Sequence, residues 1–478
     1  MSSTEFRSGP LQRSLWCDPL FLLIAGTGLA LRWCLALQRP SLLLADADGY
    51  LAHAQSLLEL GRYAGPYTGV STAFRPPGFV FLLAIPLWLG FSSSAAVLAV
   101  QSLLSLCSFR ATAALAELAD LPRGMTLLAV AGVSCDPLLM LYSVQPMSEV
   151  PCAAVLSVAL VWCVRSGFLA GVARSDAEGV TGVWRHQSFV AAFAGMLFAA
   201  GGLIRPAVLL AAAVCFLTGA VVWLKTIRRG RAGIRSAGGG EQANLTLVCV
   251  MACGFAAGLF PWVLRNALVF GSFIPATTHG GYTLALGNNP DFYRDVIHQP
   301  PGNDGNGFPW RGDRLESWQQ RTLEEAALSG VRSGDEQALD RWYYHYALSS
   351  IRGDWSAFRR ACVLRLWRFW APTGTGTGAG VSGAVVTWLT CAWYLVWWVG
   401  LVAGLMFPGA CGGGRRVEVL LWLCVLVFCG LHLVYWTDTR MRAPLMPLLI
   451  VLSCRGLWGG YQRTRSRSNW GRTAQESI

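Results

Sequence analysis

Residues 42–79 read LLLADADGYLAHAQSLLELGRYAGPYTGVSTAFRPPGF, and this stretch decides how the rest of the chain is interpreted. It directly follows a strongly apolar segment over residues 18–38. If that segment crosses a bilayer, two carboxylates, a tyrosine, a histidine and an arginine emerge at one membrane face. These polar residues are Asp46, Asp48, Tyr50, His53 and Arg75. A loop of this kind is suited to chemistry on a substrate that a lipid carries.

The composition indicates a membrane protein that crosses the bilayer many times. Hydrophobic residues make up 54% of the 478 positions, and only 13% are charged. Apolar runs of about 17 to 25 residues recur, and each is long enough to cross a hydrocarbon core of about 30 Å as a helix. These runs do not alternate between apolar and polar residues, so a membrane β-barrel is excluded. We predict an all-α polytopic membrane protein.

The net charge of +12 could indicate nucleic-acid binding, but the positions of the basic residues favour a different explanation. Cytoplasmic loops of membrane proteins are rich in arginine and lysine. Here basic residues precede the first apolar segment and follow the second, fourth, sixth and eighth segments. Basic residues also fill the C-terminal tail. We therefore expect cytoplasmic N- and C-termini, an uncleaved N-terminal anchor, contact with membrane lipids, and no nucleic-acid partner. The expected location is a bacterial inner membrane.

The apolar runs predict about ten membrane-spanning helices. They cover residues 18–38, 95–118, 124–141, 148–164, 188–204, 206–224, 245–264, 381–406, 417–436 and 441–457. The run after Gly78 has only about 14 apolar residues and contains Pro86, which is too short for a comfortable crossing. We expect it to be an interfacial or re-entrant helix, because this assignment leaves the clusters of unpaired basic residues on one side of the membrane.

This topology divides the chain into three parts. Residues 1–264 form an N-terminal transmembrane module, in which residues 38–94 are the first external loop. Residues 265–380 form a larger external, periplasmic region. Residues 381–478 form the last transmembrane helices and a basic cytoplasmic tail. An amphipathic helix is expected over residues 49–60, with its apolar side chains on the membrane surface.

Three carboxylates are candidates for catalysis at the external face. A cap on the helix after Asp46 needs one carboxylate, so the pair Asp46 and Asp48 could also supply a general base or bind a divalent cation. Candidate cations are magnesium, manganese and zinc. Glu149 lies at the external start of a span, where an ionisable group is costly unless it has a function. Helix capping is the structural alternative for each of these residues.

Several arginines lie at the external ends of spans, against the usual distribution of positive charge. They are Arg75, Arg205, Arg265, Arg440 and Arg442. A guanidinium group matches the oxygens of a phosphate, which a polyprenyl-phosphate head group would present. Contact with the phosphates of membrane lipids is the alternative for each arginine taken singly. Their convergence favours substrate binding, foremost for Arg205 and Arg442.

A glycine-rich polar stretch begins the larger external region. Residues 277–290 read TTHGGYTLALGNNP, and the amides of Asn288 and Asn289 could bind sugar hydroxyls or a phosphate. A turn-rich connection is the structural alternative. The stretch is not a P-loop, because no Gly-Lys-Ser/Thr sequence follows.

The order of these motifs resembles bacterial family 39 glycosyltransferases, the relatives of protein O-mannosyltransferases and of lipid A aminoarabinose transferase. The first external loop carries the resemblance through Asp46-x3-Tyr50-x3-Ala54-x2-Leu57-x3-Gly61 and Arg75-Pro76-Pro77-Gly78. Similar recurring pieces are Ser148-Glu149, Ile204-Arg205-Pro206, Arg265-Asn266, Gly280-Gly281-Tyr282, Gly287-Asn288-Asn289-Pro290 and Arg440-x-Arg442-x-Pro444. The resemblance extends from Asp46 to Pro447, and it lies in the order of the motifs rather than in any one of them.

The resemblance implies a GT-C fold, a polyprenyl-phosphate sugar donor, and a loop carboxylate that serves as catalytic base or metal ligand. Asp46 matches the family's loop aspartate by its distance from Tyr50. The family often has an adjacent Asp-Glu pair, whereas here Ala47 separates two aspartates. The partner's role would pass to Asp48, and the need for a metal stays open. The acceptor would be a lipid, a glycan or a protein.

Two other classes of function remain as alternatives. A transporter or a lipid or glycan flippase is expected to place ionisable residues near the midplane of broken, repeated helices. Here the charges lie at span ends, and the large loop is on one side. A non-catalytic assembly subunit would leave the loop with Asp46 unexplained.

Overall fold

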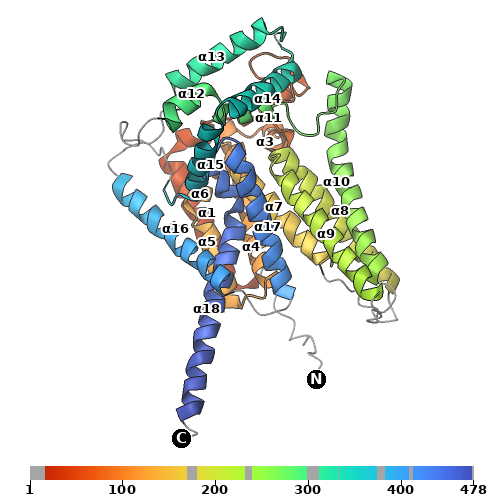
Figure 1. Cartoon of the computed structure of the whole chain (residues 1–478), viewed down its shortest axis with the longest axis vertical. Coiled ribbons are helices and arrows are strands. Elements are labelled where there is room, and N and C mark those ends of the chain that lie inside the picture. Colours follow the sequence, from red (N-terminus) through yellow and green to blue (C-terminus); the bar gives the residue numbers. More distant parts are fainter. Residues whose placement is uncertain are drawn as a thin grey trace.

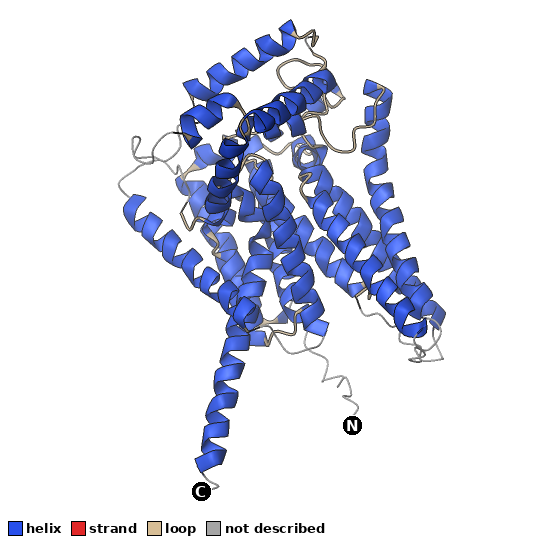
Figure 2. Cartoon of the chain, viewed as in Figure 1, coloured by secondary structure: helices blue, strands red, loops and turns tan. Residues whose placement is uncertain are grey.

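The structure of the chain is a computed structural model that describes residues 17–169, 180–231, 240–298, 310, 312–332, 334–373, 383–407 and 413–475. Within these ranges the chain is helical apart from its connections (Figure 2). One isolated bridge, between Ala64 and Ser71, is the sole β pairing in this part of the chain. The all-α prediction is confirmed.

Eight helical segments in the described ranges are long and apolar enough to cross a membrane. They comprise α1 (Pro19–Gln38), α4 (Ser93–Leu118), α8 (Val180–Ile204), α9 (Val208–Arg231), α10 (Gly240–Phe270), α16 (Gly383–Met406), α17 (Gly413–Val434), and α18 (Met446–Gln475) with the preceding turn η4 (Thr439–Leu445). The remaining two expected spans form shorter helices, α5 (Arg123–Ser134) and α7 (Glu149–Arg165).

The third expected span, residues 124–141, is not one helix. Helix α5 ends at Ser134, and a separate short helix, α6 (Pro137–Tyr142), follows. The residue before a proline is disfavoured in helical conformation, so Asp136 leaves the helix. Its Oδ1 then accepts the backbone N–H of Leu139 at 2.9 Å and caps α6. This buried aspartate therefore has a local structural role.

Loops that were expected on the same side of the membrane contact one another. At one end of the bundle, Asp18 pairs with Arg123 at 2.7 Å, and Asp120 accepts the backbone N–H of Gly414 at 2.8 Å. At the other end, Asp48 meets Arg440 at 3.4 Å. The C-terminal part of α18 projects from the end opposite to α11 and α14 (Figure 1). Which of the two ends faces the cytoplasm stays a prediction.

The first loop contains the turn η2 (Pro40–Leu44) and the helices α2 (Tyr50–Leu60) and α3 (Pro77–Trp88). The prediction that the apolar side chains of α2 face the membrane surface is wrong for Leu51 and Ala54, whereas Leu58 is 40% exposed. Leu51 and Ala54 are buried in the main hydrophobic core, because α2 packs against α3. Helix α3 has 12 residues, or about 18 Å of helix, which is too short to span the bilayer.

The second large loop forms a helical layer over one end of the bundle (Figure 1). We refer to its described residues between 271 and 373 as the cap. Its helices are α11 (Gly280–Gly287), α12 (Pro290–Phe292) with the π-helical turn η3 (Tyr293–Ile297), α13 (Asp313–Leu328), α14 (Glu336–Gly353) and α15 (Trp355–Trp370). The cap has its own hydrophobic core, which includes Phe292, Trp310, Trp318 and Tyr343.

Helices α8 and α10 touch along their backbones. A Cβ atom at Gly254 would lie 2.1 Å from the carbonyl oxygen of Ala192, and one at Gly195 would lie 2.0 Å from that of Met251. Gly258 continues the same stripe one turn later. Small residues at this spacing allow close helix packing in a membrane, where hydrophobic burial between helices contributes little.

Candidate active site

Five charged side chains from five separate segments meet at the end of the bundle that carries the cap. They are Arg75 before α3, Asp48 before α2, Arg440 in η4, Glu149 at the first residue of α7, and Arg205 between α8 and α9. In this order the charges alternate in sign, and neighbouring pairs lie 3.2 to 3.9 Å apart. We refer to these five residues as the charge row.

Asp48 joins two arginines that are distant in the sequence. Its Oδ1 lies 3.4 Å from Nη2 of Arg75, and its Oδ2 lies 3.4 Å from Nη1 of Arg440. Burial alone would raise the pKa of this carboxyl group, but the charges of Arg440, Arg75 and Arg205 outweigh that effect. The pKa of Asp48 therefore lies below its usual range, and the group is ionised at neutral pH.

Glu149 is completely buried and has two arginines beside it. Its Oε1 lies 3.2 Å from Nη1 of Arg205 and 3.9 Å from Nε of Arg440. Its Oε2 has no hydrogen-bond partner among the described residues. A carboxylate without solvent is stable only with such partners, so Glu149 fixes the two arginines as much as they fix it.

Asp46 lies beside the charge row and forms no ion pair within the described part of the chain. The backbone turns at Gly49, which has a φ of +76°, so that Oδ2 of Asp46 accepts the N–H of Ala52 at 2.9 Å. Its Oδ1 is buried and has no hydrogen-bond partner in that same part. Burial raises the pKa of Asp46, and the N–H groups at the start of α2 offset this only in part.

Tyr50 connects the first loop to the start of α7. Its hydroxyl lies 3.3 Å from Oγ of Ser148, the residue before Glu149. The guanidinium carbon of Arg75 lies 6.0 Å from the centre of its ring. Tyr50 is almost fully buried, so it packs against residues of the charge row and does not line an open surface.

His279 is a site residue that the sequence reasoning did not select. Its ring packs edge-on against Phe74 with 4.4 Å between ring centres, and Nδ1 lies 2.8 Å from Oγ1 of Thr283. Burial lowers the pKa of His279 to about 3, and the nearby charge of Arg75 acts in the same direction. The imidazole is therefore neutral at physiological pH. In the sequence, the position of His279 within the polar stretch 277–290 was the one feature that pointed to a site role.

No family model and no curated protein matches this chain. Solved structures do match it. The apo crystal structure of the oligosaccharyltransferase of Archaeoglobus fulgidus aligns with 96% of this chain at a TM-score of 0.53 and 13% identity. The same enzyme tethered to an acceptor peptide with the NVT sequon aligns with 94% of the chain at a TM-score of 0.53 and 14% identity.

These neighbours are GT-C enzymes. The chain has the GT-C fold. It spans about half the length of the solved enzymes, because the alignments cover 53% and 50% of their chains. At this level of identity the likeness concerns the fold, and the chemistry of the site depends on the residues of this chain.

Within this GT-C fold, two of the candidate arginines are engaged by the protein itself. Arg265 donates to the carbonyl oxygens of Thr72 and Tyr63, each at 2.8 Å, and so holds the first loop. Arg442 is 1% exposed and donates to the carbonyl oxygens of Phe369 and Ala371 at the end of α15. The structure does not bring either guanidinium group into the charge row.

The two candidate asparagines are also buried within the protein. Asn288 donates to the carbonyl oxygens of Leu284 and Val434 and accepts from Arg365. Asn289 caps α12 by accepting the N–H of Phe292 at 2.7 Å. Asn288 connects α11 to α15 within the cap and to α17 in the bundle, and Asn289 orders the turn between α11 and α12. Their expected contact with substrate has no geometric support.

The divalent cation expected from the sequence stays a prediction, and the described residues offer it no complete set of ligands. Among the described residues, no three histidine, cysteine, aspartate or glutamate side chains gather as a metal site. Both oxygens of Asp48 face guanidinium groups, and one oxygen of Asp46 faces a backbone N–H. Guanidinium groups already neutralise Asp48, and the described residues form no oxygen-rich cage of the kind that magnesium or manganese requires.

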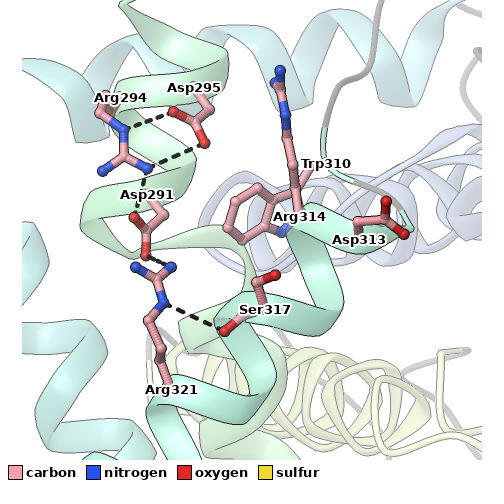
Figure 3. Close-up of a pocket in the computed structure, with 8 residues that line it drawn as sticks. All are labelled: Asp291, Arg294, Asp295, Trp310, Asp313, Arg314, Ser317 and Arg321. Atoms are coloured by element: carbon pink, nitrogen blue, oxygen red, sulfur yellow. Dashed lines mark hydrogen bonds and ion pairs between the residues drawn. The ribbon is translucent and has the colours of Figure 1, made fainter.

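A separate pocket of about 380 Å³ lies in the cap, between α12, η3 and α13 (Figure 3). Its walls carry charges that pair with one another. Asp291 binds Arg294 at 2.7 Å and Arg321 at 2.8 Å, and Asp295 binds Arg294 at 2.7 Å. Asp313 and Arg314 also line this pocket. Its charged residues come from neighbouring helices of the cap, whereas the charge row gathers side chains from five separate segments and is the stronger candidate for an active site.

Proposed function

We propose that this chain is a membrane glycosyltransferase of the family 39 type. It transfers a sugar from a polyprenyl-phosphate donor to a hydroxyl group of a lipid, glycan or protein acceptor. The site is at the external face of a bacterial inner membrane. One observation supports the proposal above the others: a GT-C fold brings three arginines and three carboxylates together where helices leave the membrane.

The three arginines of the charge row are suited to a lipid phosphate. Arg75, Arg205 and Arg440 have side chains that are 20%, 16% and 23% exposed, so each reaches solvent while it remains positioned by carboxylates. Guanidinium groups bind phosphate oxygens in pairs of parallel hydrogen bonds. Their position beside the membrane matches a head group that a polyprenyl chain holds at that depth.

In the proposed reaction, the acceptor oxygen attacks the anomeric carbon of the donor sugar with inversion. The bond between that carbon and the phosphate oxygen breaks, and the phosphate leaves with the bonding electrons. The arginines stabilise the negative charge on the leaving phosphate. The acceptor's proton passes to a carboxylate, for which we propose Asp46. A phosphate is already a good leaving group, so no general acid is required.

The two loop aspartates have environments that suit different tasks. The raised pKa of Asp46 makes it the stronger base of the two, because a base is most effective when its pKa lies nearer the working pH. The lowered pKa of Asp48 keeps it ionised, and its ion pairs orient Arg75 and Arg440. Glu149 has the same orienting task for Arg205.

The direct test is binding of polyprenyl phosphate to the purified full chain in nanodiscs, with the matching polyprenol as the control. We expect tighter binding of the phosphate form, and we expect Arg440→Gln and Arg205→Gln to remove the preference. Donors that carry different sugars are then screened for release of polyprenyl phosphate. Equal binding of the phosphate and the alcohol by the wild-type chain would contradict the proposal.

A further inference from the structure

Helix α14 presents three polar side chains at intervals of four residues. They are Glu336, Asp340 and Tyr344. Residues spaced in this way lie on one face of a helix. Together they contact three chain segments, and each of these segments carries or adjoins a residue of the candidate site.

Glu336 holds the first loop and the connection into α11 with a single oxygen atom. Its Oε2 accepts the N–H of Ala73 and the hydroxyl of Thr278, each at 3.0 Å. The N–H of Thr278 in turn donates to the carbonyl oxygen of Ala73 at 3.0 Å. Ala73 lies two residues before Arg75, and Thr278 directly precedes His279.

Asp340 holds the start of α11 against α14. Its Oδ1 accepts the N–H of Gly281 at 2.7 Å. A Cβ atom at Gly281 would lie 2.1 Å from the carbonyl oxygen of Asp340, and one at Gly280 would lie 2.1 Å from the hydroxyl of Tyr344. Gly280 and Gly281 therefore permit close contact between α11 and α14, and this contact fixes the segment that bears His279.

Tyr344 extends the same face toward the third segment. Its hydroxyl oxygen lies 3.4 Å from that of Tyr435, which is five residues before Arg440. One helix of the cap thus contacts three segments that are far apart in sequence and that supply Arg75, His279 and Arg440. The chain connectivity alone does not hold them together.

We propose that Glu336 is a positioning residue that sets the place of Arg75 in the charge row. This inference rests on the proposed function for its consequence in binding, but not for its structural part. The opposite side of the same loop is held by Arg265, through the carbonyl oxygen of Thr72, and by the hydroxyl of Tyr63, through that of Arg75. Loss of the Glu336 contact removes two of the hydrogen bonds that fix the backbone before Arg75, and it leaves the bond between Thr278 N–H and the carbonyl oxygen of Ala73 as the remaining link on that side.

The test compares Glu336→Ala with Glu336→Gln and uses Asp335→Ala as the matched control. Asp335 is the neighbouring carboxylate, and it caps α14 by accepting the N–H of Ala338 without contact to the first loop. Hydrogen exchange of the purified full chain, read on peptides that contain Ala73, needs no ligand. Loss of one hydrogen bond to a charged group corresponds to about 10- to 100-fold faster exchange of that amide.

We expect faster exchange at Ala73 in Glu336→Ala only. Glutamine should restore slow exchange, because both hydrogen bonds end on one oxygen and an amide oxygen can accept both. Unchanged exchange in Glu336→Ala, or fast exchange in Glu336→Gln, would overturn the structural part. An equal effect of Asp335→Ala would assign the change to helix fraying and would also overturn it.

The second measurement is the affinity of the same variants for polyprenyl phosphate. We expect Glu336→Ala to bind it about 10-fold more weakly, with Glu336→Gln and Asp335→Ala close to wild type. If the wild-type chain binds polyprenyl phosphate and Glu336→Ala binds it equally well despite faster exchange at Ala73, the positioning role is wrong. If the wild-type chain shows no preference for the phosphate, the proposed function fails, and the exchange result still decides the contact.

Discussion

Arg440 and Arg442 lie two residues apart, yet the structure predicts that the same substitution mainly lowers stability at Arg442 and mainly weakens phosphate binding at Arg440. Arg442 donates two hydrogen bonds to carbonyl oxygens, at 2.8 and 2.5 Å, and its guanidinium carbon lies 4.3 Å from the ring centre of Tyr394. Lysine can keep one of the two hydrogen bonds and part of the contact with the ring. We expect Arg442→Lys to lower the free energy of unfolding by about 3 kcal/mol, from one charged hydrogen bond of about 1.5–3 kcal/mol and about half of a cation–π contribution of about 2 kcal/mol.

Arg440 is partly exposed, and its partners are carboxylates at 3.4 to 3.9 Å, so Arg440→Lys should cost only about 1 kcal/mol in stability. It should weaken the binding of polyprenyl phosphate about 10- to 100-fold, because an ammonium group cannot form paired hydrogen bonds with a phosphate. Thermal unfolding in detergent and binding in nanodiscs measure the two effects separately. A large loss of affinity in Arg442→Lys with an unchanged melting temperature would refute this assignment of roles and restore Arg442 as a phosphate ligand.

The remaining predictions concern the loop aspartates and the topology. Asp46→Asn keeps the capping oxygen but removes the base, so turnover with a polyprenyl-phosphate sugar donor should fall about 10²–10⁴-fold, and near-wild-type turnover would leave Glu149 as the next candidate. The raised pKa of Asp46 means that its contribution to stability is present below its unfolded value of 3.8 and is lost as the pH rises through the folded pKa, so Asp46→Asn should raise the melting temperature at pH 7. The lowered pKa of Asp48 has the opposite sign: its contribution is present above 3.8 and is lost as the pH falls through the folded pKa, so Asp48→Asn should lower the melting temperature at pH 7. Melting curves between pH 3 and pH 7 check both statements, and a shift of the same sign in the two variants would contradict them. Cysteines introduced near Arg228 should resist labelling from outside intact cells, whereas one at Tyr67, which is 92% exposed in the first loop, should react.

The sequence predicted the class of fold because its evidence is local. Each span is a continuous apolar run, and the basic residues between the runs assign the ends, so the expected order of spans needed no knowledge of tertiary contacts. One exception has a local cause that is readable from the sequence, and the other depends on a contact between two helices. Asp136-Pro137 divides one expected span by proline chemistry, and α2 turned its apolar residues to the core because α3 covers it.

The roles of single arginines could not be read in the same way. Arg75, Arg265, Arg440 and Arg442 occupy equivalent places in the sequence, at the ends of apolar runs. A guanidinium group in that place can meet a carboxylate, a backbone carbonyl or a lipid phosphate, and the choice depends on segments far away in the chain. Arg265 meets carbonyl oxygens of the first loop, whereas Arg440 meets Asp48, which lies 392 positions away. The spacing of residues in the sequence does not reveal these long-range contacts.

The backbone contact between α8 and α10 makes the geometry of the charge row depend on residues in the membrane-spanning part of the protein. Arg205 directly follows α8, and Arg265 lies in α10, so one arginine of the charge row and one that holds the first loop are attached to the same pair of helices. A single methyl group at Gly254 would have to displace the carbonyl oxygen of Ala192, and a rigid helix transmits such a wedge along its length. A substitution in the apolar contact between α8 and α10 can therefore displace the charged side chains of the distant site while the protein still inserts into the membrane. The loss of activity in such a variant would resemble a failure of insertion.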